Sequence, residues 1–360
     1  MSDEILKDKI PTKPFTIMNK ESPGYVRMSL AAAITLGFKD GLFYRGAKLQ
    51  CINLLITYKE GCRANCAYCG LSRKRVGEFE DKSFIRVEWP VYKLEEIITR
   101  MEERQDKIKR ICVSMITNPR AVPDLMTIIK NIRNRIDTPI SLLVTPTMLK
   151  EADLARFKQL GADRIGIAVD AATPELFDKH RGKWVNGPHK WLTYWNMLEV
   201  AVKIFGETMV GCHLIVGLGE TEEELLSTIQ KVYDLGVRTH LFSFFPEADS
   251  RLAKQSQPPV GSYRRIQLGR FLIDEGIVKF DNFVFGSTGH LKDFGVPREE
   301  LTKVIDSGIP FVTSGCPDET GKVVCTRPYG DCQPGPDIRS YPFVPEEDDI
   351  AQIKKQLWKH

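Results

Sequence analysis

The sequence predicts an α/β fold built around a parallel sheet, and three observations lead to this prediction. Strand-like and helix-like segments alternate between about residues 51 and 285. Several of the strand-like segments are rich in Val and Ile and apolar on both faces, as buried parallel strands are. The alternation occurs six times, which indicates right-handed βαβ units. Because six units do not complete an eight-fold barrel, we expect an open, partial (β/α)6 barrel of the TIM type or a doubly wound sheet.

The individual elements follow from hydrophobic periodicity. The expected strands are the runs 51–58, 110–116, 140–144, 164–170, 209–217 and 239–245. The expected helices between them are the segments 93–103, 122–136, 148–160, 190–205 and 221–235. Thr221 and Glu224 form a capping box, and Thr173 places a capping hydroxyl ahead of Pro174. These signals predict helix starts at both places.

The chain divides into three predicted regions. Residues 1–50 are expected to be an N-terminal extension, with a short helix in the apolar run 29–38. Residues 51–285 are expected to form the partial barrel. Residues 286–360 lose the alternation, and their loop-rich stretch 315–345 holds many Gly and Pro and three cysteines. Such a segment needs more than an apolar core to fold, so we expect a cluster-binding appendage that ends in an amphipathic helix near 346–359.

Composition narrows the class of protein. The 360 residues are 42% hydrophobic and 27% charged, with a formal net charge of +4. This is a globular composition, and its charge gives no reason to expect a nucleic acid or a membrane as partner. The charged start of the chain lacks an apolar signal segment, so we expect a cytoplasmic protein. Its nine cysteines, an odd number, favour metal binding over a disulfide framework.

Three of these cysteines lie close together directly after the first expected strand. Cys62, Cys66 and Cys69 have the spacing C-x3-C-x2-C. In parallel α/β folds the loops at this end of the strands carry the active site. A structural zinc would need a fourth ligand from elsewhere in the chain. A four-iron cluster held by three cysteines keeps one iron free to bind a small molecule.

With Tyr68 just before the third cysteine, the motif resembles that of the radical S-adenosylmethionine (radical SAM) superfamily, C-x3-C-x-aromatic-C. The resemblance covers about residues 51–285. It implies that Cys62, Cys66 and Cys69 hold a [4Fe-4S] cluster whose free iron chelates S-adenosylmethionine. It also implies that one electron breaks the sulfonium–C5′ bond and that the resulting 5′-deoxyadenosyl radical removes hydrogen from an unactivated C–H bond. The three cysteines would then be the catalytic residues.

The same resemblance suggests which residues contact the cofactor. Asp170 matches the position at which biotin synthase places a carboxylate on the ribose hydroxyls. The string from Gly217 to Thr221 is nearly that of biotin and lipoyl synthases, where glycine allows close backbone approach to the adenosyl group. Arg181 and His189 are candidates for the carboxylate of S-adenosylmethionine, with ordinary structural roles as the alternative. The full set of implied cofactor contacts is Tyr68, Ser114, Thr117, Asn118, Asp170, Arg181, His189, Gly217 and Gly219.

Cys51, Cys112 and Cys212 lie on expected strands. Biotin synthase holds an internal two-iron cluster with strand cysteines, but the comparison fails here. The third expected strand has no cysteine, and Cys212 is one residue out of step. A shift of one residue turns a strand side chain to the opposite face. We therefore interpret these three cysteines as structural.

The C-terminal cysteines Cys316, Cys325 and Cys332 suggest a second metal site. A zinc site or unrelated thiols are the alternatives to an auxiliary iron–sulfur cluster. Arg339-Ser340-Tyr341, which follows Gly335-Pro336, resembles the Arg-Ser-Ser-Tyr motif of lipoyl synthases, whose serine ligates an auxiliary cluster. Lipoyl synthases usually carry the auxiliary cysteines near the N-terminus, so the present order resembles the two-protein form of that family. The resemblance implies a second [4Fe-4S] cluster at Cys316, Cys325, Cys332 and Ser340.

These resemblances imply sulfur insertion into an octanoyl chain on a lysine of a carrier protein or peptide. In this hypothesis the auxiliary cluster donates the sulfur. The implied partners are the octanoylated carrier or peptide, an electron donor such as ferredoxin or flavodoxin, and a second radical SAM protein. One alternative is a biotin-synthase-like or other small-molecule enzyme whose second cluster anchors substrate or relays electrons. Another is a non-catalytic zinc or iron–sulfur protein.

Overall fold

The computed structural model describes residues 20–330, 335 and 338–359. Its main sheet has eight strands in the order β3-β1-β2-β4-β5-β6-β7-β8. Successive pairs from β2 to β8 are parallel, which gives the six-stranded partial barrel that the alternation predicts. These six strands are β2 (Cys51–Ile56), β4 (Arg110–Ser114), β5 (Ile140–Val144), β6 (Ala162–Asp170), β7 (Val210–Val216) and β8 (Arg238–Ser243).

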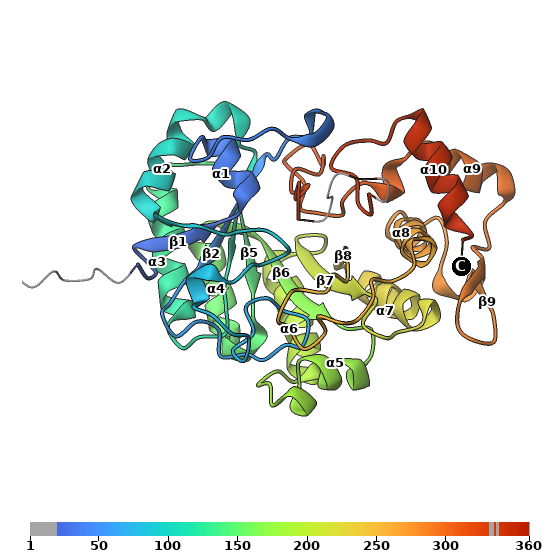
Figure 1. The fold of residues 1–360 in the computed structure, drawn as a ribbon, viewed down its shortest axis with the longest axis horizontal. Coiled ribbons are helices and arrows are strands. Elements are labelled where there is room, and N and C mark those ends of the chain that lie inside the picture. The colour runs from blue at the N-terminus through green and yellow to red at the C-terminus, as the bar shows by residue number, and fades with distance from the viewer. Residues whose placement is uncertain (1–19, 331–334, 336–337, 360) are drawn as a thin grey trace, which may run out of the picture.

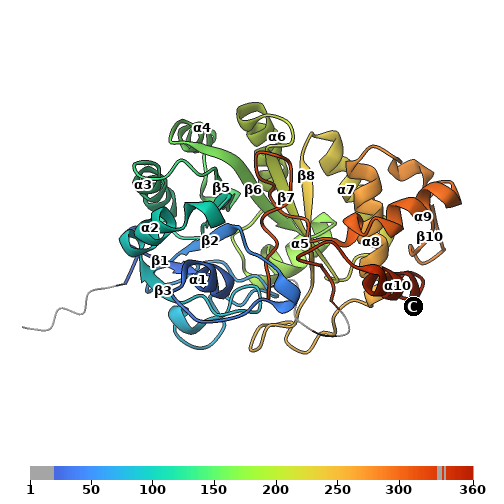
Figure 2. The ribbon, with the colours of Figure 1, turned by 90° about the horizontal axis from the view of Figure 1, so that it is seen from above.

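Helices cover the outer side of the curved sheet (Figure 2). They are α2 (Leu94–Glu103), α3 (Ala121–Arg133), α4 (Glu151–Gln159), α6 (Trp191–Phe205) and α7 (Glu222–Asp234). Each helix buries its apolar stripe against the strands, so that one hydrophobic core lies between sheet and helices. The predicted caps are present, because Thr221 and Glu224 bond each other's backbone at the start of α7. Thr173 likewise accepts from the Leu176 amide at the start of α5 (Pro174–His180).

Residues 20–50 add an edge to the barrel sheet. The strand β1 (Tyr25–Met28) pairs antiparallel with β2 on one side and with β3 (Val91–Lys93) on the other. The helix α1 (Leu30–Leu36) follows within the apolar run that predicts a helix. Part of the expected extension is therefore built into the sheet. Periodicity does not indicate β1 and β3 because both strands are very short.

The helix α8 (Val260–Asp274) is absent from the sequence-based prediction. Its buried side chains include Arg264, Arg265 and Gln267, so the helix shows no continuous apolar stripe. Arg265 forms a buried ion pair with Glu222 of α7 at 2.6 Å. Arg264 donates to the carbonyls of Ile338 and Arg339. These contacts allow α8 to fasten the C-terminal region to the barrel.

The C-terminal region contains β9 (Val284–Phe285), β10 (Leu291–Asp293), α9 (Arg298–Asp306) and α10 (Glu347–Leu357), the last within the predicted amphipathic segment. Figure 1 shows α8, α9 and α10 grouped on one side of the barrel. Residues between α9 and α10 return to the barrel, where the Ser314 hydroxyl accepts a hydrogen bond from the Leu241 amide of β8 at 2.7 Å. Among the described residues, every helix is too short or too polar to cross a membrane.

Candidate active site

The first cysteine motif lies on the loop after β2, at the carboxyl ends of the parallel strands. This loop is held in place by contacts with two other segments, the loop after β4 and the stretch between β6 and α6. The Arg63 amide donates to the Thr117 carbonyl at 2.8 Å, and the Ala67 amide donates to the His180 carbonyl at 2.7 Å. The Asn65 side chain donates to the Val185 carbonyl at 2.5 Å. The loop is therefore fixed by its neighbours as well as by its own turns.

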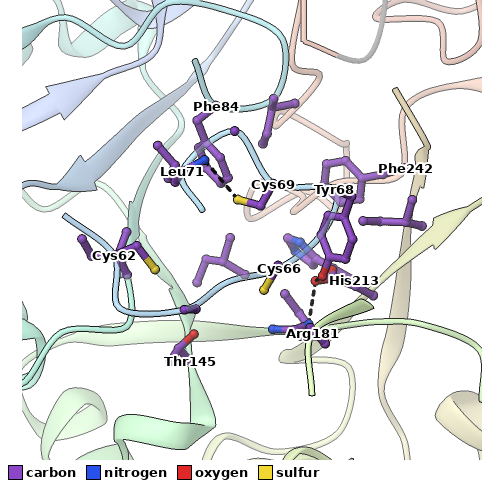
Figure 3. A pocket seen from close by; sticks show the side chains of 18 of the residues that line it. Cys62, Cys66, Tyr68, Cys69, Leu71, Phe84, Thr145, Arg181, His213 and Phe242 are labelled. Carbon is purple, nitrogen blue, oxygen red and sulfur yellow. Dashed lines mark hydrogen bonds and ion pairs between the residues drawn. The ribbon is translucent and has the colours of Figure 1, made fainter. Parts of the chain in front are cut away.

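Cys62, Cys66 and Cys69 all line one pocket, together with Tyr68 (Figure 3). Burial raises the pKa of all three thiols, that of Cys66 to about 12 although Arg181 opposes the shift. Such thiols are neutral near pH 7 unless a cation stabilises their thiolates, as a metal does. The residues present therefore fit a site that becomes anionic only when it is loaded with metal.

The described residues contain no group of three or more His, Cys, Asp or Glu side chains close enough to hold a single metal ion. This result applies to Cys62, Cys66 and Cys69 too. A cluster of several irons spreads its ligands farther apart than one ion does, because each thiolate binds a different iron. The three thiols therefore fit a multi-iron cluster, which is what the sequence resemblance implies.

Asp170 and Arg181 form the polar wall of the same pocket. Asp170 ends β6 with a φ of 66°, at a point where the register with β7 shifts. Arg181 pairs with its carboxylate at 2.6 Å, and the Tyr68 hydroxyl donates to the same carboxylate. The motif tyrosine therefore connects the cysteine loop to the residue that the resemblance places on the ribose.

Arg181 offers a donor for an anionic ligand. Its Nε is buried and has no hydrogen-bond partner among the described residues. His189 lies nearby, with Nδ1 2.9 Å from the Tyr194 hydroxyl and 2.7 Å from the Thr147 hydroxyl. Burial lowers the pKa of His189 to about 2, with the Arg181 charge adding to the shift. His189 is therefore neutral, and Arg181 supplies the positive charge, as a bound carboxylate requires.

The remaining predicted contacts fall in different places. Thr117 lines the pocket with the cysteines, whereas Ser114 lines a second pocket deeper in the barrel. Asn118 donates to the Gly61 carbonyl at 3.4 Å and accepts from the Arg120 amide at 3.0 Å. Its side chain thus supports the cysteine loop and the start of α3.

Gly217 and Gly219 belong to a turn whose shape requires glycine. Their φ values are 105° and 115°, and a Cβ on Gly217 would lie 2.7 Å from Pro258. The Glu220 carboxylate accepts from the amides of Gly217 and Leu218, at 2.5 and 2.8 Å. Burial raises the pKa of Glu220 to about 7. The turn accounts for both glycines, and their contact with an adenosyl group stays a prediction.

Much of the pocket wall has no counterpart among the predicted residues. One part of the wall comes from the end of β8 and the residues after it, namely Phe242, Phe244 and Phe245. Another part comes from the loop before β3, namely Phe84 and Ile85. Glu247 holds these two segments together, because it accepts from the Ser83 hydroxyl and the Arg86 amide, each at 2.7 Å. The only sequence signal is the position of Phe242–Phe245 at the end of an expected strand. The result is a pocket whose walls are largely apolar.

Cys316 and Cys325 line the second pocket, and Cys332 lies outside the described residues. Cys325 is buried, and its pKa is lowered to about 6, first by a hydrogen bond with Cys51. The Ser340 hydroxyl is buried 2.8 Å from the Tyr263 hydroxyl of α8. The role of Ser340 as a ligand therefore stays a prediction.

Comparison with known proteins identifies the barrel. Residues 56–232 match the model of the family described as the radical SAM superfamily. No curated protein matches the chain. Similar solved structures include methylornithine synthase (PylB), at 14% identity and a TM-score of 0.48, over 68% of this chain and 66% of that one.

Two further solved structures resemble this chain. The FeFe-hydrogenase maturase HydG from Carboxydothermus hydrogenoformans matches at 17% identity and a TM-score of 0.48, over 68% of this chain and 56% of that one. Coproporphyrinogen III oxidase (HemN) from Escherichia coli matches at 18% identity and a TM-score of 0.38, over 60% of this chain and 50% of that one. The chain thus spans less than two thirds of the length of methylornithine synthase, HydG and HemN.

Proposed function

Since residues 56–232 form a radical SAM superfamily domain, we propose that this chain inserts sulfur into an octanoyl chain on a lysine of a carrier protein or peptide. The observation that carries the proposal is a cysteine-lined, largely apolar pocket that adjoins a second thiol-lined pocket inside the same barrel. When bound at Cys62, Cys66 and Cys69, a [4Fe-4S] cluster supplies the electron that cleaves S-adenosylmethionine to a hydrogen-abstracting radical.

The polar wall of the pocket suits the cofactor. Asp170 is fixed by Arg181 and Tyr68, so its carboxylate is held in one place as a hydrogen-bond acceptor for ribose hydroxyls. Arg181 lines the pocket with a permanent positive charge, which suits the carboxylate of the cofactor. These residues orient the cofactor, and because burial keeps His189 neutral near pH 7, Arg181 supplies the positive charge of this wall.

The apolar wall suits an acyl chain. Phe84, Ile85, Phe242 and Leu143 contribute to both pockets, so a chain that enters beside the cysteines meets apolar surface toward the second set of thiols. Burial of each methylene of an octanoyl group contributes about 0.8 kcal/mol.

The second thiol set supports sulfur insertion over other radical chemistry. Cys316 and Cys325 approach the barrel interior from the side opposite the first motif, which gives an acyl carbon a sulfur source within the same cavity system. The sequence resemblance adds Cys332 and Ser340 to this proposed auxiliary [4Fe-4S] site. We propose ferredoxin or flavodoxin as electron donor and a second radical SAM protein as partner.

The mass of an octanoyl-lysyl peptide after anaerobic turnover tests the proposal. The reconstituted chain is incubated with S-adenosylmethionine and a strong reductant, alone and with a second radical SAM protein. We expect the peptide to gain sulfur in a reaction that also releases 5′-deoxyadenosine. Release of 5′-deoxyadenosine without a change in peptide mass, in both incubations, would refute sulfur insertion and favour a small-molecule substrate.

A further inference from the structure

The second pocket contains a cysteine that belongs to the barrel itself. Cys112 lies in the middle of β4, and its register partners are Asn53 of β2 and Ser141 of β5. Asn53, Cys112 and Ser141 all line the second pocket, so this part of the sheet turns them to the barrel interior. Cys112 therefore faces a cavity beside two polar side chains. A purely structural cysteine would instead be packed in the apolar core.

Cys316 and Cys325 line the same pocket from the C-terminal region. The Asn53 amide nitrogen lies 3.6 Å from the Cys325 sulfur and 3.7 Å from the Cys51 sulfur. The Cys112 thiol interacts electrostatically with both Cys316 and Cys325. Three thiols from distant parts of the sequence therefore converge on one cavity, whereas Cys51, which bonds with Cys325, is not among the lining residues.

The C-terminal segment is docked firmly enough to keep these thiols in place. Arg110, at the start of β4, donates from Nε to the Pro317 carbonyl at 2.8 Å and pairs with Asp163 at 2.7 Å. The Thr326 hydroxyl donates to the Lys48 carbonyl at 2.9 Å, next to Cys325. Each of the two C-terminal cysteines thus has an adjacent residue bonded to β4 or to the segment that leads into β2.

We propose that Cys112 joins Cys316 and Cys325 as ligands of an iron–sulfur cluster that lies inside the barrel. This inference rests on the second cluster of the proposed function and gives one of its four irons a ligand from β4, in place of Cys332 or Ser340. Three thiols that line one cavity are the ligand type that an iron–sulfur cluster requires. The C-terminal cysteines therefore do not form a separate metal-binding module, because the barrel completes their site.

The position of this cluster has a consequence for the substrate. The second pocket shares Leu143, His213 and Phe242 with the pocket of the first motif. Figure 3 shows His213 and Phe242 beside the cysteine loop. The two clusters would then lie in adjoining pockets, with these shared residues between them.

Iron content tests the assignment without any substrate. In a chain with Cys62, Cys66 and Cys69 all replaced by Ala, we expect about four iron atoms per chain after anaerobic reconstitution, all of them at the second site. Adding Cys112→Ala should remove most of this iron. Adding Cys212→Ala instead is the matched control, because Cys212 is a buried cysteine on β7 next to His213 and so on the other face of its strand.

Retention of the iron in the Cys112→Ala chain, or zinc in place of iron in its parent, would overturn the proposal. Cys112→Ala made in the otherwise unchanged chain should still cleave S-adenosylmethionine, which shows that the fold is intact. Alkylation of the unaltered protein gives a second measurement. Removal of iron by a chelator should make Cys112 react with the reagent together with Cys316 and Cys325. Equal labelling of Cys112 before and after chelation would contradict its role as a ligand.

These outcomes are separate from those of the proposed function. If the iron depends on Cys112 but octanoyl peptide never gains sulfur, the ligand assignment stands and the reaction is wrong. If the peptide gains sulfur while Cys112→Ala leaves the iron content unchanged, the reaction stands and the ligand assignment is wrong.

Discussion

The two cysteine-bearing regions of this chain differ in how their thiols are brought together. Cys62, Cys66 and Cys69 lie on one loop, and short-range turns such as the bond from the Cys69 amide to the Cys66 carbonyl shape it. Cys112, Cys316 and Cys325 come from a barrel strand and from a segment that follows more than two hundred residues later, as the residue numbers show. The first set is local in sequence, and the second set depends on tertiary docking.

This difference predicts different sensitivities. A site on one loop survives as long as the loop and its strand are folded. A site assembled across the barrel is lost when the C-terminal region moves away from β4. The contacts of α8 with residues 338–339 and the contacts of Arg110 with Pro317 control that docking.

The largest expected effect comes from the local set. We expect Cys66→Ala to abolish cleavage of S-adenosylmethionine, because the first cluster loses one of its three ligands. Iron should fall from about eight to about four atoms per chain, since the second site does not use this loop. The measurement is 5′-deoxyadenosine release together with iron analysis. A parallel loss of all iron would show that the two sites form one cooperative unit.

Loss of iron from the second site alone should follow from a substitution on α8 that changes no cysteine. Arg264 donates to the carbonyls of Ile338 and Arg339 and to the Gln356 side chain from the centre of α8. Arg264→Met removes a buried charged donor from these acceptors, of which the Arg339 carbonyl still accepts from Gln267, and this loss costs on the order of 3 kcal/mol. We expect iron at the second site to decrease while the first site still cleaves S-adenosylmethionine.

A matched control for Arg264→Met is Lys303→Met. Lys303 forms an i,i+4 pair with Glu299 on the surface of α9, and both side chains are largely exposed. Such a pair contributes little to stability, so this variant should keep all of its iron. Equal iron loss in both variants would mean that docking through α8 does not control the second site.

The same contrast explains which features the sequence could predict. The partial barrel is predictable because strands such as β5 (Ile140–Val144) and helices such as α7 show strong periodicity. The first motif is predictable because its spacing is contiguous. The strand order of the structure confirms the barrel, and residues 56–232 match the radical SAM superfamily model, whereas sulfur insertion remains a proposal.

Other features required the three-dimensional structure. α8 buries arginines that pair with Glu222 and with carbonyls, so it lacks the stripe that identifies a surface helix. Cys112 looks structural in the sequence, because nothing local indicates that it faces Cys316 and Cys325. The positions of Asn53 and Ser141 beside it follow only from strand register.

The smallest expected effect concerns Ser340, whose hydroxyl lies 2.8 Å from that of Tyr263. We expect Ser340→Ala to keep the iron of the second site, since three thiols suffice to hold a cluster with one iron free. To act as a ligand, the Ser340 side chain would have to give up its hydrogen bond with Tyr263. In that case Ser340→Ala should lower sulfur insertion by about tenfold, which corresponds to about 1.4 kcal/mol of lost transition-state stabilisation. The measurements are iron content and sulfur gained per octanoyl peptide.

Tyr263→Phe is the control that separates the two roles of this serine. It removes the hydrogen bond between the two hydroxyl groups but leaves the Ser340 oxygen in place. If Ser340 binds iron, Tyr263→Phe should keep most of the sulfur insertion that Ser340→Ala loses. If both variants lose the same fraction, the serine acts by holding residues 339–341 against α8. The second site would then depend only on the docking of the C-terminal region against the barrel, in contrast to the loop that holds the first cluster.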